Sequence, residues 1–155
     1  MTALDHMVCF SLYSASRATT QAYRRLLEPW GLTYPQYLVL VELWDRGPRS
    51  VRDLGDDLAL DSGTLSPLLR RMEHAGLVTR SRTEADGRLV TIALTDRGEA
   101  LRTETAAVPG QVAACLGLTV DTAPDVLELL HRLTGNVRAS NDTDPALAAS
   151  VPHER

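Results

Sequence analysis

The chain contains no lysine and few aromatic residues, and both shortages narrow what it can be. Its 155 residues include one Phe, two Trp and four Tyr, so the core must consist mainly of Leu, Val and Ala, which favours helices. One compact domain is expected at this length. All 16 fixed positive charges are arginines, which suit bidentate recognition of phosphate and guanine, although a bias in the coding DNA could have the same result.

Long apolar runs, clustered cysteines and clustered histidines are also missing. The sequence has no run of eighteen apolar residues, and residues 1–7 lack the basic and long apolar segments of a secretion signal. We therefore expect no membrane association and a cytoplasmic location. Cys9 and Cys115 lie far apart and the four histidines are scattered, so no metal site, disulfide framework or other cofactor is predicted. The net charge of -4 argues against indiscriminate binding to polyanions, so any DNA-binding role depends on where the arginines lie.

Apolar spacing and capping residues predict that helices dominate. The predicted helices cover about residues 5–28, 34–46, 51–58, 62–75, 96–115 and 123–140. Their expected N-caps include Thr33, Ser50, Asp61 and Thr95. Pro67 lies beyond the first turn that Asp61 would cap, so we expect a slight kink or a late helix start, and Pro109 predicts a bend. The composition of residues 141–155 predicts a disordered tail.

The periodicity changes between residues 77 and 94. Two β-rich runs, 77–82 and 89–94, flank Asp86-Gly87, and glycine supplies the positive φ that a tight turn needs. A two-stranded hairpin is therefore predicted. Over about residues 50–94 the predicted order of elements is helix, tight turn, helix and hairpin. This is the order found in a winged helix-turn-helix.

In a winged helix-turn-helix the second helix enters the major groove of DNA with its N-terminal end forward. The predicted DNA-contacting residues are polar or basic side chains of this helix and of the hairpin: Ser62, Thr64, Ser66, Arg70, Arg71, Arg80, Arg82 and Arg88. Two other interpretations stay open. The arginines could be solvated surface residues, and a winged helix can also bind protein.

Cys9 lies on the first predicted helix, with Tyr13 one turn away and Tyr23 fourteen residues further along nearly the same face. A lone helical cysteine is commonly a small buried hydrophobe, and tyrosines at this spacing can simply pack against a core. Fourteen residues of helix span about 21 Å, so Cys9 and Tyr23 cannot meet within one straight helix, but they could meet across a dimer whose first helices cross antiparallel. A phenol that donates a hydrogen bond to the sulfur would favour thiolate, the form that attacks a peroxide.

Residues 32–40, 60–73 and 76–80 resemble the MarR family of repressors and, more narrowly, its organic-hydroperoxide-sensing OhrR branch. The resemblance covers about residues 8–140. It implies a mainly α fold with a small β-hairpin wing in a single domain, 1–140, with the winged helix-turn-helix at about 33–95. It also implies a homodimer, formed by helices at about 5–28 and 96–140, that binds a pseudo-palindromic double-stranded DNA operator.

The resemblance assigns roles to the thiols and tyrosines. Cys9 matches the peroxide-sensing cysteine, and Tyr23 and Tyr34 match two tyrosines that hold the reduced sulfur of the partner subunit. Tyr13 matches a tyrosine implicated in the oxidised state. Cys115 lies about where some members carry a second cysteine that forms an intersubunit disulfide, the alternative being a small buried residue.

We therefore predict a transcriptional repressor, not an enzyme, that releases its operator when an organic hydroperoxide oxidises Cys9. One alternative is a MarR-type repressor that responds to a small organic ligand in a pocket at the dimer interface, in which case Cys9→Ser would leave the response intact. A thiol peroxidase is a further alternative, but the chain lacks a thioredoxin-like βαβ pattern.

Overall fold

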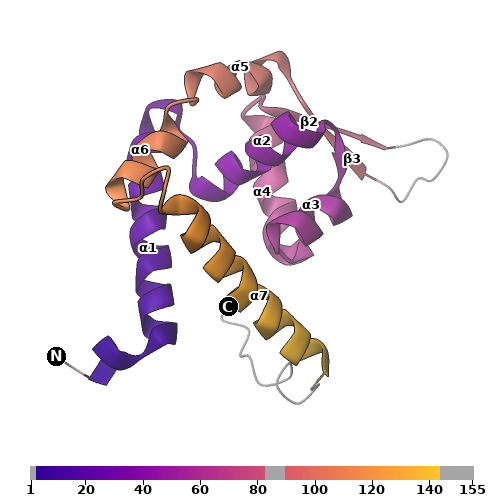
Figure 1. Ribbon diagram of the computed structural model, residues 1–155. Helices are drawn as coiled ribbons and strands as arrows, with labels where there is room; N and C mark the ends of the chain where they lie inside the picture. The colour runs from indigo at the N-terminus through magenta and orange to yellow at the C-terminus, as the bar shows by residue number, and fades with distance from the viewer. Residues whose placement is uncertain (1–2, 83–89, 144–155) are drawn as a thin grey trace. The chain divides into compact units, whose positions relative to one another are not determined.

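The computed structural model describes residues 3–82 and 90–143, and the chain divides into two compact units, residues 1–112 and 113–155. The helices are α1 (Val8–Leu27), α2 (Tyr34–Arg46), α3 (Val51–Leu58), α4 (Ser62–His74), α5 (Asp96–Glu104), α6 (Val108–Cys115) and α7 (Ala123–Thr143) (Figure 1). Two short 3-10 helices, Ala3–His6 and Glu28–Trp30, flank α1. None of the described helices is both long enough and apolar enough to cross a membrane.

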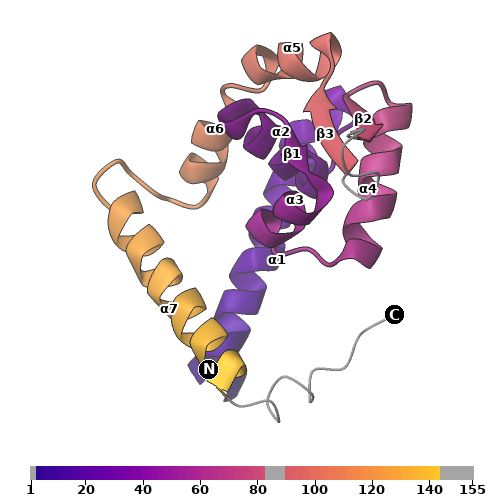
Figure 2. The same ribbon diagram turned by 90° about the vertical axis from the view of Figure 1, so that its right-hand side faces the viewer.

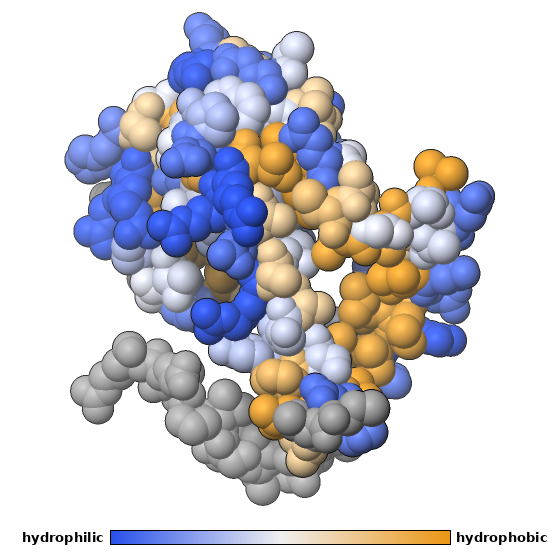
Figure 3. Space-filling model, turned by 90° about the vertical axis from the view of Figure 1, so that its left-hand side faces the viewer, coloured by the Kyte–Doolittle hydropathy of each residue, from blue (hydrophilic) through white to orange (hydrophobic). Residues whose placement is uncertain are grey.

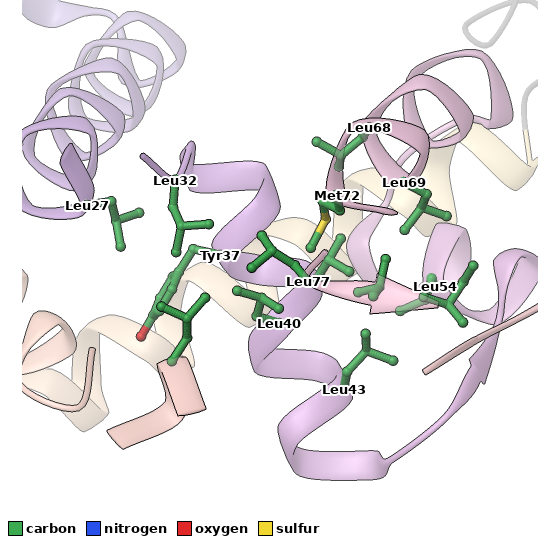
Figure 4. Close-up of a cluster of buried hydrophobic side chains, with 14 of the residues drawn as sticks. Leu27, Leu32, Tyr37, Leu40, Leu43, Leu54, Leu68, Leu69, Met72 and Leu77 are labelled. Carbon is green, nitrogen blue, oxygen red and sulfur yellow. The ribbon is translucent and has the colours of Figure 1, made fainter. Parts of the chain in front are cut away.

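Leucine dominates the core, which lies entirely in the first unit. Tyr37 and Leu27 lie at one end of the cluster and Leu54 and Leu69 at the other (Figure 4). Burying each such leucine contributes about 1.5–3 kcal/mol relative to leaving it exposed. The described part of the second unit contributes no buried hydrophobic residue, so one core holds the helices and strands of the first unit together.

The sheet has three strands, where the sequence predicted two. Strand β3 (Val90–Leu94) lies between β2 (Val78–Arg82) and β1 (Arg49–Ser50), and both pairings are antiparallel (Figure 2). Arg49 pairs with Ile92, so β1 joins the start of α3 to the hairpin. The two-residue strand escaped prediction because so short a segment has no alternation, and its partner lies about forty residues further along.

The predicted caps of α3, α4 and α5 are confirmed. The Ser50 hydroxyl accepts from Asp53 N–H at 3.1 Å, the Asp61 carboxylate from Thr64 N–H at 2.9 Å, and the Thr95 hydroxyl from Gly98 N–H at 3.1 Å. Of the two alternatives expected at Pro67, a slight kink or a late start of α4, the late start is wrong, because this helix begins at Ser62 and continues past Pro67. Asp61 caps the first turn, and the proline removes only one later backbone bond.

The helix predicted from Thr95 towards Cys115 is two helices, because α5 ends at Glu104 and α6 begins at Val108. Pro109 stands in the first turn of α6 instead of at a bend, where its missing N–H costs nothing. The helix α7 continues to Thr143, three residues beyond its expected end at residue 140, and residues 144–155 lie outside the described part of the chain.

Candidate functional site

Helix α4 has one buried side and one exposed side. Leu65, Leu68, Leu69 and Met72 face the core. Of the residues predicted to contact DNA, Ser62, Thr64, Arg70 and Arg71 are exposed and Ser66 is half-buried. Because the leucine stripe fixes how the helix rotates against the core, these polar side chains are directed to solvent, where a DNA groove could receive them.

The N-terminus of α4 is held by a reciprocal contact between Asp61 and Thr64. One carboxylate oxygen accepts the Thr64 N–H, and the Thr64 hydroxyl donates to the other at 2.9 Å. These hydrogen bonds hold the pKa of Asp61 below its usual value, so the residue is charged at neutral pH. Since the Thr64 hydroxyl already donates to Asp61, it can offer a DNA base only its oxygen lone pairs and its methyl group.

Some arginines in and near the helix-turn-helix form ion pairs with acidic residues, and others do not. Arg49 contacts Asp57 at 2.6 Å and lowers the pKa of that carboxyl, and Arg46 contacts Glu42 at 3.1 Å. In the described part of the chain, four other arginines of α3, α4 and β2 form no ion pair: Arg52, Arg70, Arg71 and Arg80. These elements therefore carry positive charge that no acidic residue neutralises, as a DNA-binding surface on an acidic protein requires.

A hollow of about 570 Å³ lies between α3, the start of α4 and the sheet. Arg52, Ser62, Ser66 and Arg80 are among the residues that line it. The sequence reasoning did not include Arg52, although an exposed arginine in the first turn of α3 is a usable signal, because the first helix of such a unit crosses the DNA backbone.

The predicted wing lies only partly within the described residues. Arg80 pairs with Ile92 in the ladder between β2 and β3 and is half-buried. Arg82 belongs to the last position of β2, and its backbone pairs with Val90. The predicted turn at residues 86–87 and the predicted contact Arg88 lie in the segment 83–89, outside the described residues.

Cys9 is exposed in the first turn of α1, and the nearby Tyr13 is also exposed. The Arg17 guanidinium donates to the Tyr13 hydroxyl at 2.9 Å and lies 5.7 Å from its ring centroid. Because α1 is one continuous helix, Cys9 and Tyr23 stand near opposite ends of it. The structure thus agrees with the expectation that these two residues cannot meet within one chain.

Tyr23 of α1 stacks on Tyr34 of α2, with ring centroids 4.1 Å apart and planes 20° from parallel. Burial raises the pKa of both phenols, and for Tyr23 the neighbouring Tyr34 and Tyr37 add to the increase. Both hydroxyls therefore stay protonated, as hydrogen-bond donors, at neutral pH. Among the described residues neither hydroxyl has a hydrogen-bond partner, so each is available to another group.

Tyr37 continues this cluster and was missed at the sequence level. Its ring centroid is 5.8 Å from that of Tyr23 and 6.0 Å from that of Trp44, and burial raises the pKa of its phenol although the Thr105 side chain lowers it. Its position three residues after Tyr34, on the same side of one helix, was the available signal.

Cys115 is the last residue of α6 and is exposed in the single chain. Apolar side chains are exposed too, as the orange surface in Figure 3 illustrates. On α1 they include Val8, Phe10 and Leu12, and on α7 Leu127, Leu129, Leu130 and Val137. Exposed apolar surface of this kind is typical of helices that contact a further surface.

Residues 32–90 match the MarR family. The organic hydroperoxide resistance transcriptional regulator of Bacillus subtilis is 44% identical over 130 residues, which cover 84% of this chain and 86% of that protein. The reduced, DNA-bound structure of AbfR, a Staphylococcus epidermidis protein, matches with a TM-score of 0.70 and 37% identity over 86% of this chain and 94% of AbfR. Overoxidized, DNA-bound AbfR and disulfide-formed AbfR match as well, with TM-scores of 0.70 and 0.63.

Bordetella bronchiseptica BpsR, whose DNA binding is regulated by 6-hydroxynicotinic acid, matches with a TM-score of 0.75 and 26% identity, over 82% of this chain and 98% of BpsR.

Proposed function

The chain belongs to the MarR family and is a DNA-binding transcriptional regulator rather than an enzyme, and from this premise we propose that it is a repressor switched by oxidation of Cys9. The reduced protein binds its operator. An organic hydroperoxide oxidises Cys9, and the protein then releases the DNA.

The proposed active species is a homodimer in which helices at about residues 5–28 and 96–140 form the interface. The exposed apolar residues of α1 and α7 support this assembly, because a second copy of the chain would remove them from water. Two α4 helices would then enter successive major grooves of a pseudo-palindromic operator, with half-sites about one helical turn apart.

The observation that carries the sensing proposal is the separation of a thiol from two unpartnered phenols along one helix. Cys9 is exposed at the start of α1, whereas Tyr23 and Tyr34 stack near its other end, with hydroxyls that have no hydrogen-bond partner among the described residues. If two α1 helices cross antiparallel, each thiolate meets the phenol pair of the partner subunit. Hydrogen bonds from two phenols to one sulfur would favour the thiolate.

The chemistry is a two-electron oxidation of sulfur. The Cys9 thiolate attacks the terminal oxygen of the hydroperoxide ROOH, so that an S–O bond forms and the O–O bond breaks. The leaving alkoxide takes up a proton and becomes the alcohol ROH, and Cys9 becomes a sulfenic acid. The sulfur no longer carries the negative charge that accepted the hydrogen bonds of Tyr23 and Tyr34.

Cys115 is proposed to resolve this sulfenic acid. Its thiolate, from the partner subunit, attacks the oxidised Cys9 sulfur, an S–S bond forms and hydroxide leaves, to be protonated to water. The exposure of both sulfur-bearing residues supports this step. The disulfide would hold the two winged units in a spacing that no longer matches the half-sites.

The test is fluorescence anisotropy of labelled upstream DNA with the full-length protein, before and after one equivalent of cumene hydroperoxide. We expect the wild type to release the DNA and Cys9→Ser to stay bound. Cys115→Ser is the matched control, because it keeps the sensor but should not crosslink on a non-reducing gel.

Equal release by the wild type and by Cys9→Ser would contradict the proposal and favour a repressor that responds to a small organic ligand. A Cys115→Ser chain that still formed crosslinked dimers would contradict only the two-cysteine scheme.

A further inference from the structure

Helix α5 follows directly after the wing, and its first turn is packed against the start of β2. Thr95 donates its N–H to Leu77 O at 3.1 Å, and Gly98 approaches the same carbonyl so closely that a Cβ atom there would lie 2.1 Å from the oxygen. Since Thr95 connects β3 to α5, the wing strands and the start of α5 cannot move independently.

Helix α2 holds α5 at both ends through aromatic side chains. The Trp44 indole N–H donates to Gly98 O at 3.0 Å, in the first turn of α5. The Tyr37 hydroxyl interacts with the side chain of Thr105, a buried residue directly after the last turn. The position of α5, and with it the base of the wing, therefore depends on how these two rings lie.

The same two rings extend the tyrosine pair of the sensing proposal. Tyr34 stacks on Tyr23, Tyr23 contacts Tyr37 at 5.8 Å, and Tyr37 contacts the Trp44 ring edge-on at 6.0 Å between centroids. Four aromatic rings thus form a continuous row from α1 to α5. In an interior packed this closely, a ring cannot turn unless its neighbours also move.

We propose that Tyr37 and Trp44 are positioning residues that couple the Tyr23–Tyr34 pair to α5 and, through it, to the wing. This inference rests on the proposed redox function. When oxidation of Cys9 ends its hydrogen bonds to Tyr23 and Tyr34, the row of rings shifts, and the Trp44 contact with Gly98 carries the shift to the base of the wing. DNA affinity falls because the wing no longer lies where the operator requires it.

Trp30 offers a matched control because it contacts the same helix, α5. Its indole N–H donates to a Glu104 carboxylate oxygen at 2.9 Å, at the last residue of α5. Among the described residues its ring forms no aromatic pair with the tyrosine row. Trp30→Phe therefore removes an indole hydrogen bond to α5 without interrupting the row. Trp44→Phe, in contrast, removes the hydrogen bond that connects the row to α5.

The experiment measures the operator Kd of reduced and of cumene-hydroperoxide-oxidised protein for the wild type, Trp44→Phe, Tyr37→Phe and Trp30→Phe. If the coupling holds, oxidised Trp44→Phe and oxidised Tyr37→Phe bind DNA at least about fivefold more tightly than the oxidised wild type. A factor of five is about 1 kcal/mol, the net contribution of one side-chain hydrogen bond. Their reduced forms stay within about threefold of the wild type, and Trp30→Phe behaves as the wild type in both states.

A purely structural role gives a different pattern, in which Trp44→Phe weakens binding in both redox states and the ratio of oxidised to reduced Kd does not fall. That result, or a Trp30→Phe ratio that falls equally, overturns the inference and leaves the proposed function standing. If the oxidised wild type keeps its operator, the proposed function and this inference both fail.

A second measurement requires no substitution in the row. With only two tryptophans in the chain, Trp30→Phe leaves Trp44 as the only indole fluorophore. Oxidation of the Trp30→Phe protein in the absence of DNA should shift the fluorescence emission of Trp44. The shift should be absent from the double variant that also carries Cys9→Ser. Unchanged emission from fully oxidised protein overturns the inference.

Discussion

The rings of Tyr23 and Tyr34 stack with their centroids 4.1 Å apart, although Tyr23 belongs to α1 and Tyr34 is the first residue of α2. The contact places two phenol groups together on half-buried surface, near the end of α1 that is remote from Cys9. Stacking restrains both side chains before any sulfur arrives, so less conformational entropy is lost when a thiolate accepts their hydrogen bonds.

Removing one hydroxyl of this pair should slow the sensor without unfolding it. In Tyr34→Phe the ring still stacks on Tyr23, but one hydrogen bond to the thiolate is lost. A hydrogen bond to a charged group contributes about 1.5–3 kcal/mol, so we expect oxidation of Cys9 to slow by roughly tenfold or more. Trapping of the sulfenic acid with dimedone, followed by mass spectrometry over time, measures the rate. An unchanged rate together with an unchanged melting temperature would remove Tyr34 from the sensing site.

The free energy of unfolding should decrease at alkaline pH. Burial raises the pKa of Tyr23, Tyr34 and Tyr37 in the folded chain above the ordinary value, so in the unfolded chain these phenols ionise at lower pH. Their contribution is therefore fully present below about pH 9 and is lost as the pH rises through about 10 towards the folded values. The chain has no lysine side chains that would titrate in the same range.

Urea denaturation between pH 7 and 11 tests this prediction, with Cys9 and Cys115 both replaced by Ser so that no thiol titrates. When Tyr34→Phe is introduced into this protein, the free energy of unfolding should decrease less at alkaline pH. A loss of equal size in both proteins would show that Tyr34 is not responsible.

The unpaired arginines of α4 should matter for DNA binding, and a paired arginine elsewhere should not. Arg70→Ala and Arg71→Ala each remove an exposed charge with no ion pair among the described residues, and we expect roughly tenfold weaker operator binding. If the lost contact is to a phosphate, the slope of log Kd against log salt concentration should also decrease by about one. Arg102→Ala is the control, because Arg102 lies on α5 and contacts Glu99 at 3.9 Å. Equal losses at all three positions would point to net charge instead of a specific surface.

Two glycine substitutions should change stability in opposite directions. The Cβ atom of Gly98→Ala would lie 2.1 Å from Leu77 O, so the first turn of α5 must move away from β2, and we expect a loss of about 2–3 kcal/mol. Gly110 lies in α6, and apart from its chain neighbours and the nearby backbone of its own helix no atom lies within 4 Å of the position that an alanine methyl group would take there. Gly110→Ala should therefore be neutral or stabilise by up to about 1 kcal/mol. Chemical denaturation measures both, and a neutral Gly98→Ala would contradict the close approach between α5 and β2.

The features that the sequence predicted correctly depend on residues close together in the chain. The caps formed by Ser50, Asp61 and Thr95 each bond a backbone N–H three residues further on, so residue type and local spacing were enough. The leucine stripe of α4 follows from helical period alone. The proposed assignment of Cys9, Tyr23 and Tyr34 to one sensing site stays a prediction: helical spacing suggested only that Cys9 and Tyr23 could meet across a dimer, and the family resemblance supplied the rest.

What the sequence determined by itself is therefore most of the helices, the caps of three of them, the hairpin strands and the family. Tertiary structure alone decided the pairing of Arg49 with Ile92, the stacking of Tyr23 on Tyr34 and the hydrogen bond from Trp44 to Gly98, residues that stand 54 positions apart. These contacts form only when helices and strands pack around a common core, and many other arrangements of the same elements satisfy the local patterns equally well. Side-chain packing selects among them, because only the native arrangement fills the interior without voids or overlaps.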